Sequence, residues 1–180
     1  MLTDTGIRFL CLEDYPGIPE IVEDGNSFFE NALKKAKAIS EYTGEIALAD
    51  DSGLEVDFLN GQPGVHSSRF SGSIASDQTN IDKLLMELKD LPFPQRSAAF
   101  RCVLVLYHPD GQYKSFQGSL DGFITYDRQG DKGFGYDPVF FVSSYNMTFA
   151  EMPLDLKNKI SHRGKALKAL RDYLKRYSIC

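Results

Sequence analysis

The sequence predicts an α/β or α+β fold in which helices pack against a mixed β-sheet, and three observations support this. Segments with helical spacing of apolar residues alternate with short β-rich segments along the 180 residues. The turn sequence Pro109-Asp110-Gly111 lies between two β-rich segments and predicts a hairpin of antiparallel strands. Neither a G-x-G-x-x-G sequence after a strand nor a Walker A sequence is present, so a purely parallel Rossmann sheet is disfavoured.

The first half of the chain predicts two helices and three short strands. The first helix ends at Gly44, and the second ends at Pro92 because proline cannot continue a helix. A stretch with three glycines and one proline separates the last of these strands from the second helix and has to be irregular. In chain order we expect a strand at 7–12, a helix at 27–42, strands at 46–49 and 54–59, a loop at 60–73 and a helix at 81–91.

The second half predicts a hairpin-rich part of the sheet and a closing helix. Residues 98–107 are almost continuously apolar, which is typical of a central strand covered on both faces. A partner strand starts near Tyr113 after the hairpin turn. Further strands are expected at 123–126 and 139–142, and Leu167, Leu170 and Leu174 share one side of the last helix.

The composition narrows the class of protein. Twenty Lys and Arg against 25 Asp and Glu give a net charge of −5, which argues against binding to duplex nucleic acid but allows one basic pocket for a small anion. No apolar run approaches the roughly 20 residues needed to cross a membrane, and there is no signal-peptide pattern. The three widely spaced cysteines fit reduced thiols, so we expect a cytoplasmic protein.

Glu30 lies at the start of the first predicted helix and has two interpretations. Ser27 three residues before it forms the sequence of a capping box, in which each side chain satisfies a free backbone N–H. A glutamate in the first turn of a helix can also face a cleft and ligate a hard cation.

The adjacent residues Asp50 and Asp51 follow an apolar strand and precede Ser52. They are compatible with a turn, because Asp, Ser and Gly all favour turns. An aspartate at the end of a strand could instead bind Mg²⁺ and orient or deprotonate a water molecule. Within a continuous strand the two carboxylates would point to opposite faces, so at most one could enter a given cleft.

The segment from Gly133 to Pro138 combines glycines with aromatic residues. It could mark a twisted strand with close backbone approach. Alternatively, the backbone at Gly135 would approach a ligand, the rings of Phe134 and Tyr136 would stack on a base, and Asp137 would accept hydrogen bonds from ring N–H groups. The second interpretation predicts a pocket for a flat ring.

The last predicted helix begins in a cluster of basic residues. Ser161 is a good N-cap, and His162, Arg163 and Lys165 fall in the first turn. Each cation there costs about 0.3–1 kcal/mol unless an anion lies nearby. Together with Lys157, the cluster predicts a phosphate or keto-oxygen site, with a solvated basic face as the alternative.

The four segments together resemble one known family, the inosine triphosphate pyrophosphatases, also called the HAM1 family. The resemblance runs from about Pro16 to Leu167, with mild departures at Ser27 and Phe29. The segments that carry it are Glu30-Asn31-Ala32 with Lys35-Ala36, Ala49 to Leu54, Pro63-Gly64-Val65 with Ser68-Arg69, Phe134 to Pro138, and Ser161 to Leu167.

The resemblance implies an elongated mixed-sheet α/β fold with two lobes around a cleft, usually as a homodimer. It also implies Mg²⁺-dependent hydrolysis of ITP, dITP and XTP to the monophosphate and pyrophosphate, which cleanses the nucleotide pool. By position, Asp51 resembles the proton acceptor that activates water and also touches the metal, Glu30 resembles a metal ligand, and Asp50 resembles a helper. The expected substrate-binding residues are Ser52, Phe134, Gly135, Tyr136, Asp137, Lys157, His162 and Arg163.

One feature of the family is not matched. Its members begin with a strand leading into Ser/Thr-x-Asn-x-x-Lys, which holds the triphosphate, and Met1 falls after that segment. We therefore expect residues 1–180 to form a single pyrophosphatase domain that is truncated at its amino terminus relative to the family. The alternative function is that of a catalytically impaired purine nucleotide-binding protein.

Overall fold

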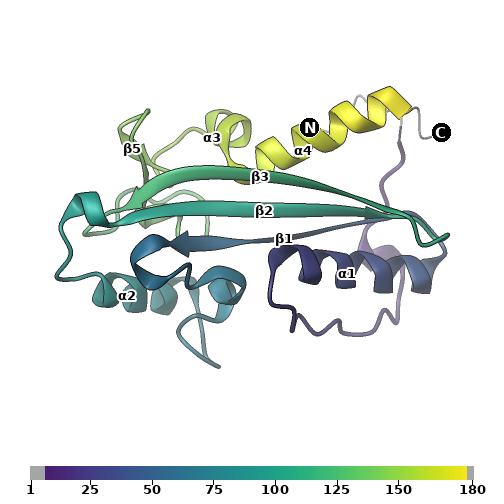
Figure 1. Cartoon of the computed structure of the whole chain (residues 1–180), viewed down its shortest axis with the longest axis horizontal. Helices are drawn as coiled ribbons and strands as arrows, with labels where there is room; N and C mark the ends of the chain where they lie inside the picture. The colour runs from purple at the N-terminus through teal and green to yellow at the C-terminus, as the bar shows by residue number, and fades with distance from the viewer. Residues whose placement is uncertain (1–6, 178–180) are drawn as a thin grey trace.

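The computed structural model describes residues 7–177 and is an elongated molecule with helices on both faces of one long sheet (Figure 1). Helices α1 and α2 lie below the sheet in Figure 1, and α3 and α4 lie above it. None of the helices in this range is long and apolar enough to span a membrane. The helices are α1 Phe28–Thr43, α2 Asp77–Glu87, α3 Leu154–Ile160 and α4 His162–Tyr177.

The sheet has five strands in the order β1-β2-β3-β4-β5, and every pairing among the described residues is antiparallel. The expectation of a mixed sheet is therefore wrong for this part of the chain, whereas the α/β class, the elongated shape and the flanking helices are confirmed. The hairpin at Pro109-Asp110-Gly111 joins β2 to β3 as predicted. The strands are β1 Ala47–Val56, β2 Ser97–Tyr107, β3 Tyr113–Ile124, β4 Phe140–Val142 and β5 Met147–Thr148.

At two places the structure has one continuous strand where the sequence predicted two. In both, hydrogen bonds to a neighbouring strand continue across the predicted break. The predicted segments 46–49 and 54–59 both overlap the single strand β1, in which all ten residues pair with β2, and residues 57–59 form a short 3-10 helix after it. The polar residues Asp50 to Gly53 thus lie within a strand and do not form a turn. In the same way, β3 runs on into the segment 123–126, which was expected to be separate.

The segment 7–12 is not a strand, contrary to the prediction. Residues 7–11 have no regular structure, and a short 3-10 turn follows at Leu12–Asp14. Phe9 and Leu10 are exposed. A strand needs a partner for its backbone N–H and C=O groups, and no strand among residues 7–177 pairs with this segment.

Strand β2 divides two apolar layers, as its continuous apolar sequence predicts. Cys102, Leu104 and Leu106 pack with α4 above the sheet. Val103, Val105 and Tyr107 belong to a separate cluster with α1 below it. This alternation follows from the two-residue period of a strand, and it assigns α1 and α4 to opposite faces.

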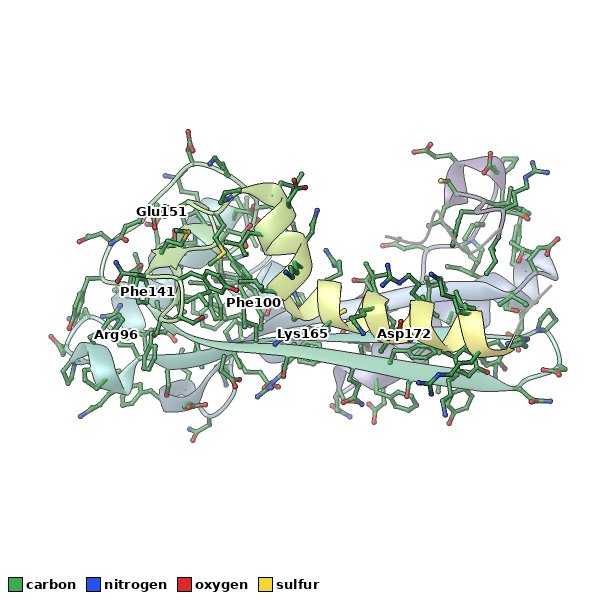
Figure 2. All side chains as sticks on the ribbon, turned by 90° about the horizontal axis from the view of Figure 1, so that it is seen from above. Arg96, Phe100, Phe141, Glu151, Lys165 and Asp172 are labelled. Carbon is green, nitrogen blue, oxygen red and sulfur yellow. The ribbon has the colours of Figure 1, made fainter. Side chains whose placement is uncertain are left out.

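Close approach of backbones places the start of α4 on the sheet. A Cβ atom at Gly118 of β3 would overlap the backbone carbonyl of His162, so only glycine permits this contact. Figure 2 shows α4 extending along the sheet from Lys165 to Asp172. The amino terminus of α4 is therefore held near the middle of the molecule.

Candidate active site

A cavity of about 360 Å³ lies where α3 and α4 meet the sheet and the loop before β4. All eight residues expected to bind substrate line it, although they come from β1, the loop at 133–137 and the two carboxyl-terminal helices. The prediction of one shared pocket for these residues is thus supported by the geometry. The lining also includes polar residues outside the expected substrate-binding set, namely Ser67, Ser68, Asp77, Asn80 and Asn158.

A loop with two left-handed glycines forms the aromatic wall of this cavity. Gly133 and Gly135 have φ angles of 81° and 56°, which side-chain-bearing residues rarely adopt. The backbone N–H of Phe134 donates to Asp137 Oδ2 at 2.8 Å. The same oxygen forms a close ion pair with Lys157, whose Nζ lies 5.1 Å from the centre of the Phe134 ring.

The two aromatic residues of the loop differ in their availability to a ligand. Phe134 is 66% exposed, so one face of its ring is open for stacking. Tyr136 is buried, and its hydroxyl donates to the backbone oxygen of Ser67 at 2.9 Å. Burial also raises the pKa of the Tyr136 hydroxyl well above its usual value. Tyr136 therefore supports the cavity floor, and Phe134 provides the exposed stacking surface.

The start of α4 carries fewer free cations than the sequence predicted. Burial, together with the positive charges of Arg163 and Lys157, lowers the pKa of His162 to about 3. The imidazole is therefore neutral at pH 7, and it stacks on Phe100 with 4.7 Å between ring centres. Its Nδ1 atom is buried and has no hydrogen-bond partner. The expectation of a cationic His162 is wrong, because the charged form is disfavoured by desolvation.

Arg163 and Ser161 complete this end of the cavity. Arg163 donates to Asp50 Oδ2 from Nη2 at 2.6 Å and from Nε at 3.1 Å. Ser161 caps α4 as predicted, since its Oγ accepts from the N–H of Gly164 at 3.1 Å. Lys165 donates to the backbone oxygen of Ser119 and does not line the cavity. The cations that face the cavity are thus Lys157 and Arg163, each paired with a carboxylate.

Asp51 lies on the other face of β1 from Asp50, as the strand period requires. Its Oδ1 accepts from Lys35 Nζ at 3.1 Å and its Oδ2 accepts from Asn31 at 3.3 Å, and both partners belong to α1. Burial raises the pKa of Asp51, although Lys35 and Asn31 oppose the shift. The raised pKa makes the carboxylate a stronger base than an exposed aspartate.

Glu30 caps the turn before α1. Ser27 Oγ accepts from the N–H of Glu30 at 3.2 Å, so the capping interpretation is confirmed for Ser27. The Glu30 carboxylate accepts from the N–H of Asn26 at 2.7 Å, one residue earlier than a capping box would place it. Neither Glu30 nor Asp51 lines the 360 Å³ cavity. Within residues 7–177, no three His, Cys, Asp or Glu side chains gather in a metal-binding cluster.

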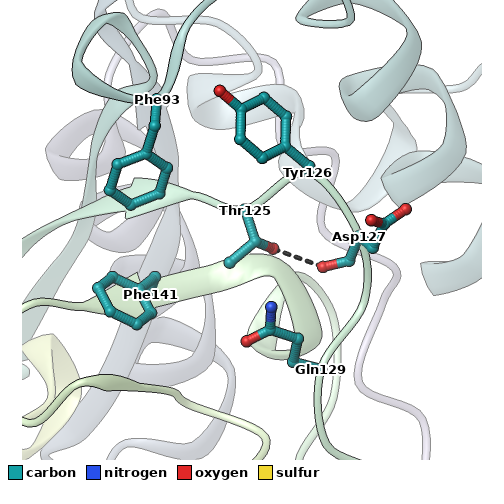
Figure 3. Close-up of a pocket in the computed structure, with 6 residues that line it drawn as sticks. All are labelled: Phe93, Thr125, Tyr126, Asp127, Gln129 and Phe141. Carbon is teal, nitrogen blue, oxygen red and sulfur yellow. Dashed lines mark hydrogen bonds between the residues drawn. The ribbon is translucent and has the colours of Figure 1, made fainter.

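A second, smaller hollow of about 200 Å³ lies at the far end of the sheet (Figure 3). Phe93, Tyr126 and Phe141 surround it, and Phe93 and Phe141 meet edge to face at 5.8 Å. Thr125 Oγ1 donates to the backbone oxygen of Asp127 at 2.7 Å. None of the residues expected to bind substrate lines this hollow.

Comparison with known proteins identifies the family of the chain. The model of the Ham1 family matches residues 1–173. The chain belongs to the Ham1 family. A dITP/XTP pyrophosphatase of Geobacter sulfurreducens is 54% identical over 165 residues, which are 92% of this chain and 83% of the relative. A dITP/XTP pyrophosphatase of Desulforamulus reducens is 49% identical over 179 residues, covering 99% and 89%.

Solved structures of Ham1 proteins have the same fold. The Ham1 protein of Staphylococcus aureus superposes with a TM-score of 0.87 at 38% identity, over 92% of this chain and 85% of that chain. A HAM1 protein of Coxiella burnetii gives a TM-score of 0.84 at 43% identity, over 88% and 82%. These matches confirm the predicted family and fold. The predicted absence of an amino-terminal Ser/Thr-x-Asn-x-x-Lys motif is supported by none of them and stays a prediction.

Proposed function

We propose that this protein hydrolyses dITP, XTP and ITP to the monophosphate and pyrophosphate, and so removes these nucleotides from the pool. The observation that supports this most strongly is the single cavity lined by all eight expected substrate-binding residues. Relatives about 50% identical over most of the chain are dITP/XTP pyrophosphatases. The cavity volume of about 360 Å³ falls within the usual range for small-molecule sites.

The base would be held by the aromatic wall. The exposed face of Phe134 can stack on a purine ring, and Lys157 and Asp137 lie beside it as donor and acceptor. A 6-keto purine presents the O6 acceptor and the N1–H donor, and the 6-amino group of adenine reverses this pattern. Leaving these buried polar groups unpaired can discriminate between bases by about 10⁴-fold or more.

The reacting water would be activated by Asp51. Because burial raises its pKa, the carboxylate has more affinity for the proton that a water molecule releases on attacking phosphorus. Asn31 and Lys35 hold its two oxygens in a fixed orientation. Arg163 at the start of α4 would bind the negative charge of the nucleotide, in exchange for Asp50.

Glu30 and Asp51 are the residues that would hold Mg²⁺. Two carboxylates suit this ion, which usually keeps several waters and binds substrate phosphates as well. When bound, the ion neutralises phosphate charge as a Lewis acid. For Glu30 this requires its carboxylate to release the N–H of Asn26.

We propose that residues 1–180 act as one pyrophosphatase domain in a cytoplasmic homodimer that binds neither nucleic acid nor membranes. A second candidate function is a purine nucleotide-binding protein with impaired catalysis. It is favoured by one observation: Glu30 and Asp51 lie outside the cavity that joins the other expected residues.

A pyrophosphate-release assay with dITP, XTP, ITP and ATP, each with and without Mg²⁺, separates the two functions. We expect Mg²⁺-dependent turnover of the first three and little turnover of ATP. Thermal unfolding is measured in parallel, because a ligand that binds only the folded state raises the unfolding temperature. Protection by ITP without turnover would refute the enzyme and support the binding protein.

A further inference from the structure

Asp77, the first residue of helix α2, lines the same cavity as the aromatic wall. Its Oδ2 accepts a hydrogen bond from the backbone N–H of Gly135 at 2.6 Å. The preceding N–H, that of Phe134, donates to Asp137. Two successive amides of the loop thus end on two carboxylates. One belongs to the loop itself, and the other comes from a helix 58 residues earlier in the chain.

The Phe134 ring has little support beyond the backbone of its own loop. Because Phe134 is 66% exposed, packing holds its side chain weakly. Phe134 lies between Gly133 and Gly135, which both have left-handed backbone conformations here. Glycine can adopt many other conformations, so the backbone alone does not fix this segment. Asp77 removes this freedom on the Gly135 side, and the helix dipole favours a carboxylate at the amino-terminal end of α2.

We propose that Asp77 is a positioning residue for substrate: through the N–H of Gly135 it sets the Phe134 ring against which the purine stacks. The inference rests on the proposed function, and it concerns a residue outside the set expected from the sequence. We expect Asp77 to affect substrate binding and not the chemical step. The proposed base, Asp51, lies on the other face of the sheet and is held by residues of α1.

Helix α2 offers a matched control. Asp82 accepts from Arg128 Nη2 at 2.9 Å, and the same nitrogen donates to the backbone oxygen of Gln78 at 3.0 Å. Asp82 is therefore also a helix carboxylate that contacts the segment before Gly135, but neither Asp82 nor Arg128 lines the cavity. A general loosening of the segment would follow from loss of either aspartate, whereas a change in the Phe134 wall would follow from loss of Asp77.

The experiment measures steady-state hydrolysis of dITP by the full chain and the variants Asp77→Ala, Asp77→Asn and Asp82→Ala. We expect Asp77→Ala to raise KM about tenfold or more and to leave kcat within twofold, as loss of one hydrogen bond to a charged group predicts. Asp77→Asn keeps an acceptor oxygen and should restore KM to within about twofold of the wild type. Asp82→Ala should leave both constants within twofold.

Hydrogen exchange of the Gly135 amide supplies a readout that does not depend on activity, and only Asp77→Ala should accelerate it. An unchanged KM in Asp77→Ala, an equal rise in Asp82→Ala, or no rescue by Asp77→Asn would overturn the inference while leaving the proposed function intact. A wild-type protein without turnover would refute the proposed function. Slow exchange at Gly135 in every variant would refute the Asp77 contact itself.

Discussion

The neutral state of His162 predicts a specific loss of stability in acid. Its pKa is lowered from the usual 6.5 to about 3, because the imidazole is buried and Arg163 and Lys157 lie nearby. Between these two values the unfolded chain binds a proton that the folded protein excludes. Stability from this group is therefore complete above about pH 6.5 and is lost as the pH falls toward 3.

The size of the effect follows from the shift. One pKa unit corresponds to 1.36 kcal/mol, so the full shift corresponds to about 5 kcal/mol. Between pH 7 and pH 4 the free energy of unfolding should fall by about 3 kcal/mol because of His162 alone. Other groups also titrate in this range, so the useful quantity is the difference between the wild type and a variant that lacks the imidazole.

His162→Phe is the appropriate variant, because it keeps a ring that can stack on Phe100. Urea unfolding of both proteins at pH 7, 6, 5 and 4 gives the free energies, and NMR titration of the imidazole gives the folded pKa. We expect the variant to lose about 3 kcal/mol less than the wild type over this range. Parallel stability curves, or an imidazole that titrates near pH 6.5 in the folded protein, would refute the reasoning.

Three other substitutions test separate parts of the structure. Asp51→Asn should lower kcat for dITP by about 10²-fold or more while dITP still raises the unfolding temperature, and near-normal turnover would exclude Asp51 as the base. Arg163→Ala should lower kcat/KM for ITP and for ATP by a similar factor, because the guanidinium binds negative charge that both nucleotides carry, and a loss of the preference for ITP would instead place Arg163 at the base. Gly118→Ala should lower the free energy of unfolding, measured by urea titration, by about 1–3 kcal/mol, because a Cβ would overlap the His162 carbonyl. A variant as stable as the wild type would contradict this contact.

The pairing of Asp50 with Arg163 has a consequence for ligand binding. Arg163 is already bound to a carboxylate on the sheet, so a phosphate or keto oxygen must compete with Asp50 for the guanidinium. A dianionic phosphate competes better than a neutral carbonyl, since charge-assisted bonds are the stronger ones. This competition favours Arg163 as a contact for charged parts of the nucleotide.

Features that depend on neighbours in the chain follow from local sequence patterns. Ser27 and Ser161 cap α1 and α4, as their positions before the helical patterns predict. The continuous apolar run of β2 is buried on both faces. The family motifs point to eight of the residues that line the cavity, because each motif is a short segment that can be recognised locally.

Features that depend on distant partners follow from the folded structure and not from local sequence. The polar segment from Asp50 to Gly53 favours a turn locally, but hydrogen bonds to β2 along the whole of β1 make it a strand. Because side chains alternate along this strand, Asp50 forms an ion pair with Arg163 on one face of the sheet. Asp51 forms an ion pair with Lys35 on the opposite face. Desolvation by Phe100 and its surroundings keeps His162 neutral. The pairing of β1 with β2 and the burial of His162 arise from residues far apart in the chain, so no local pattern could have predicted them.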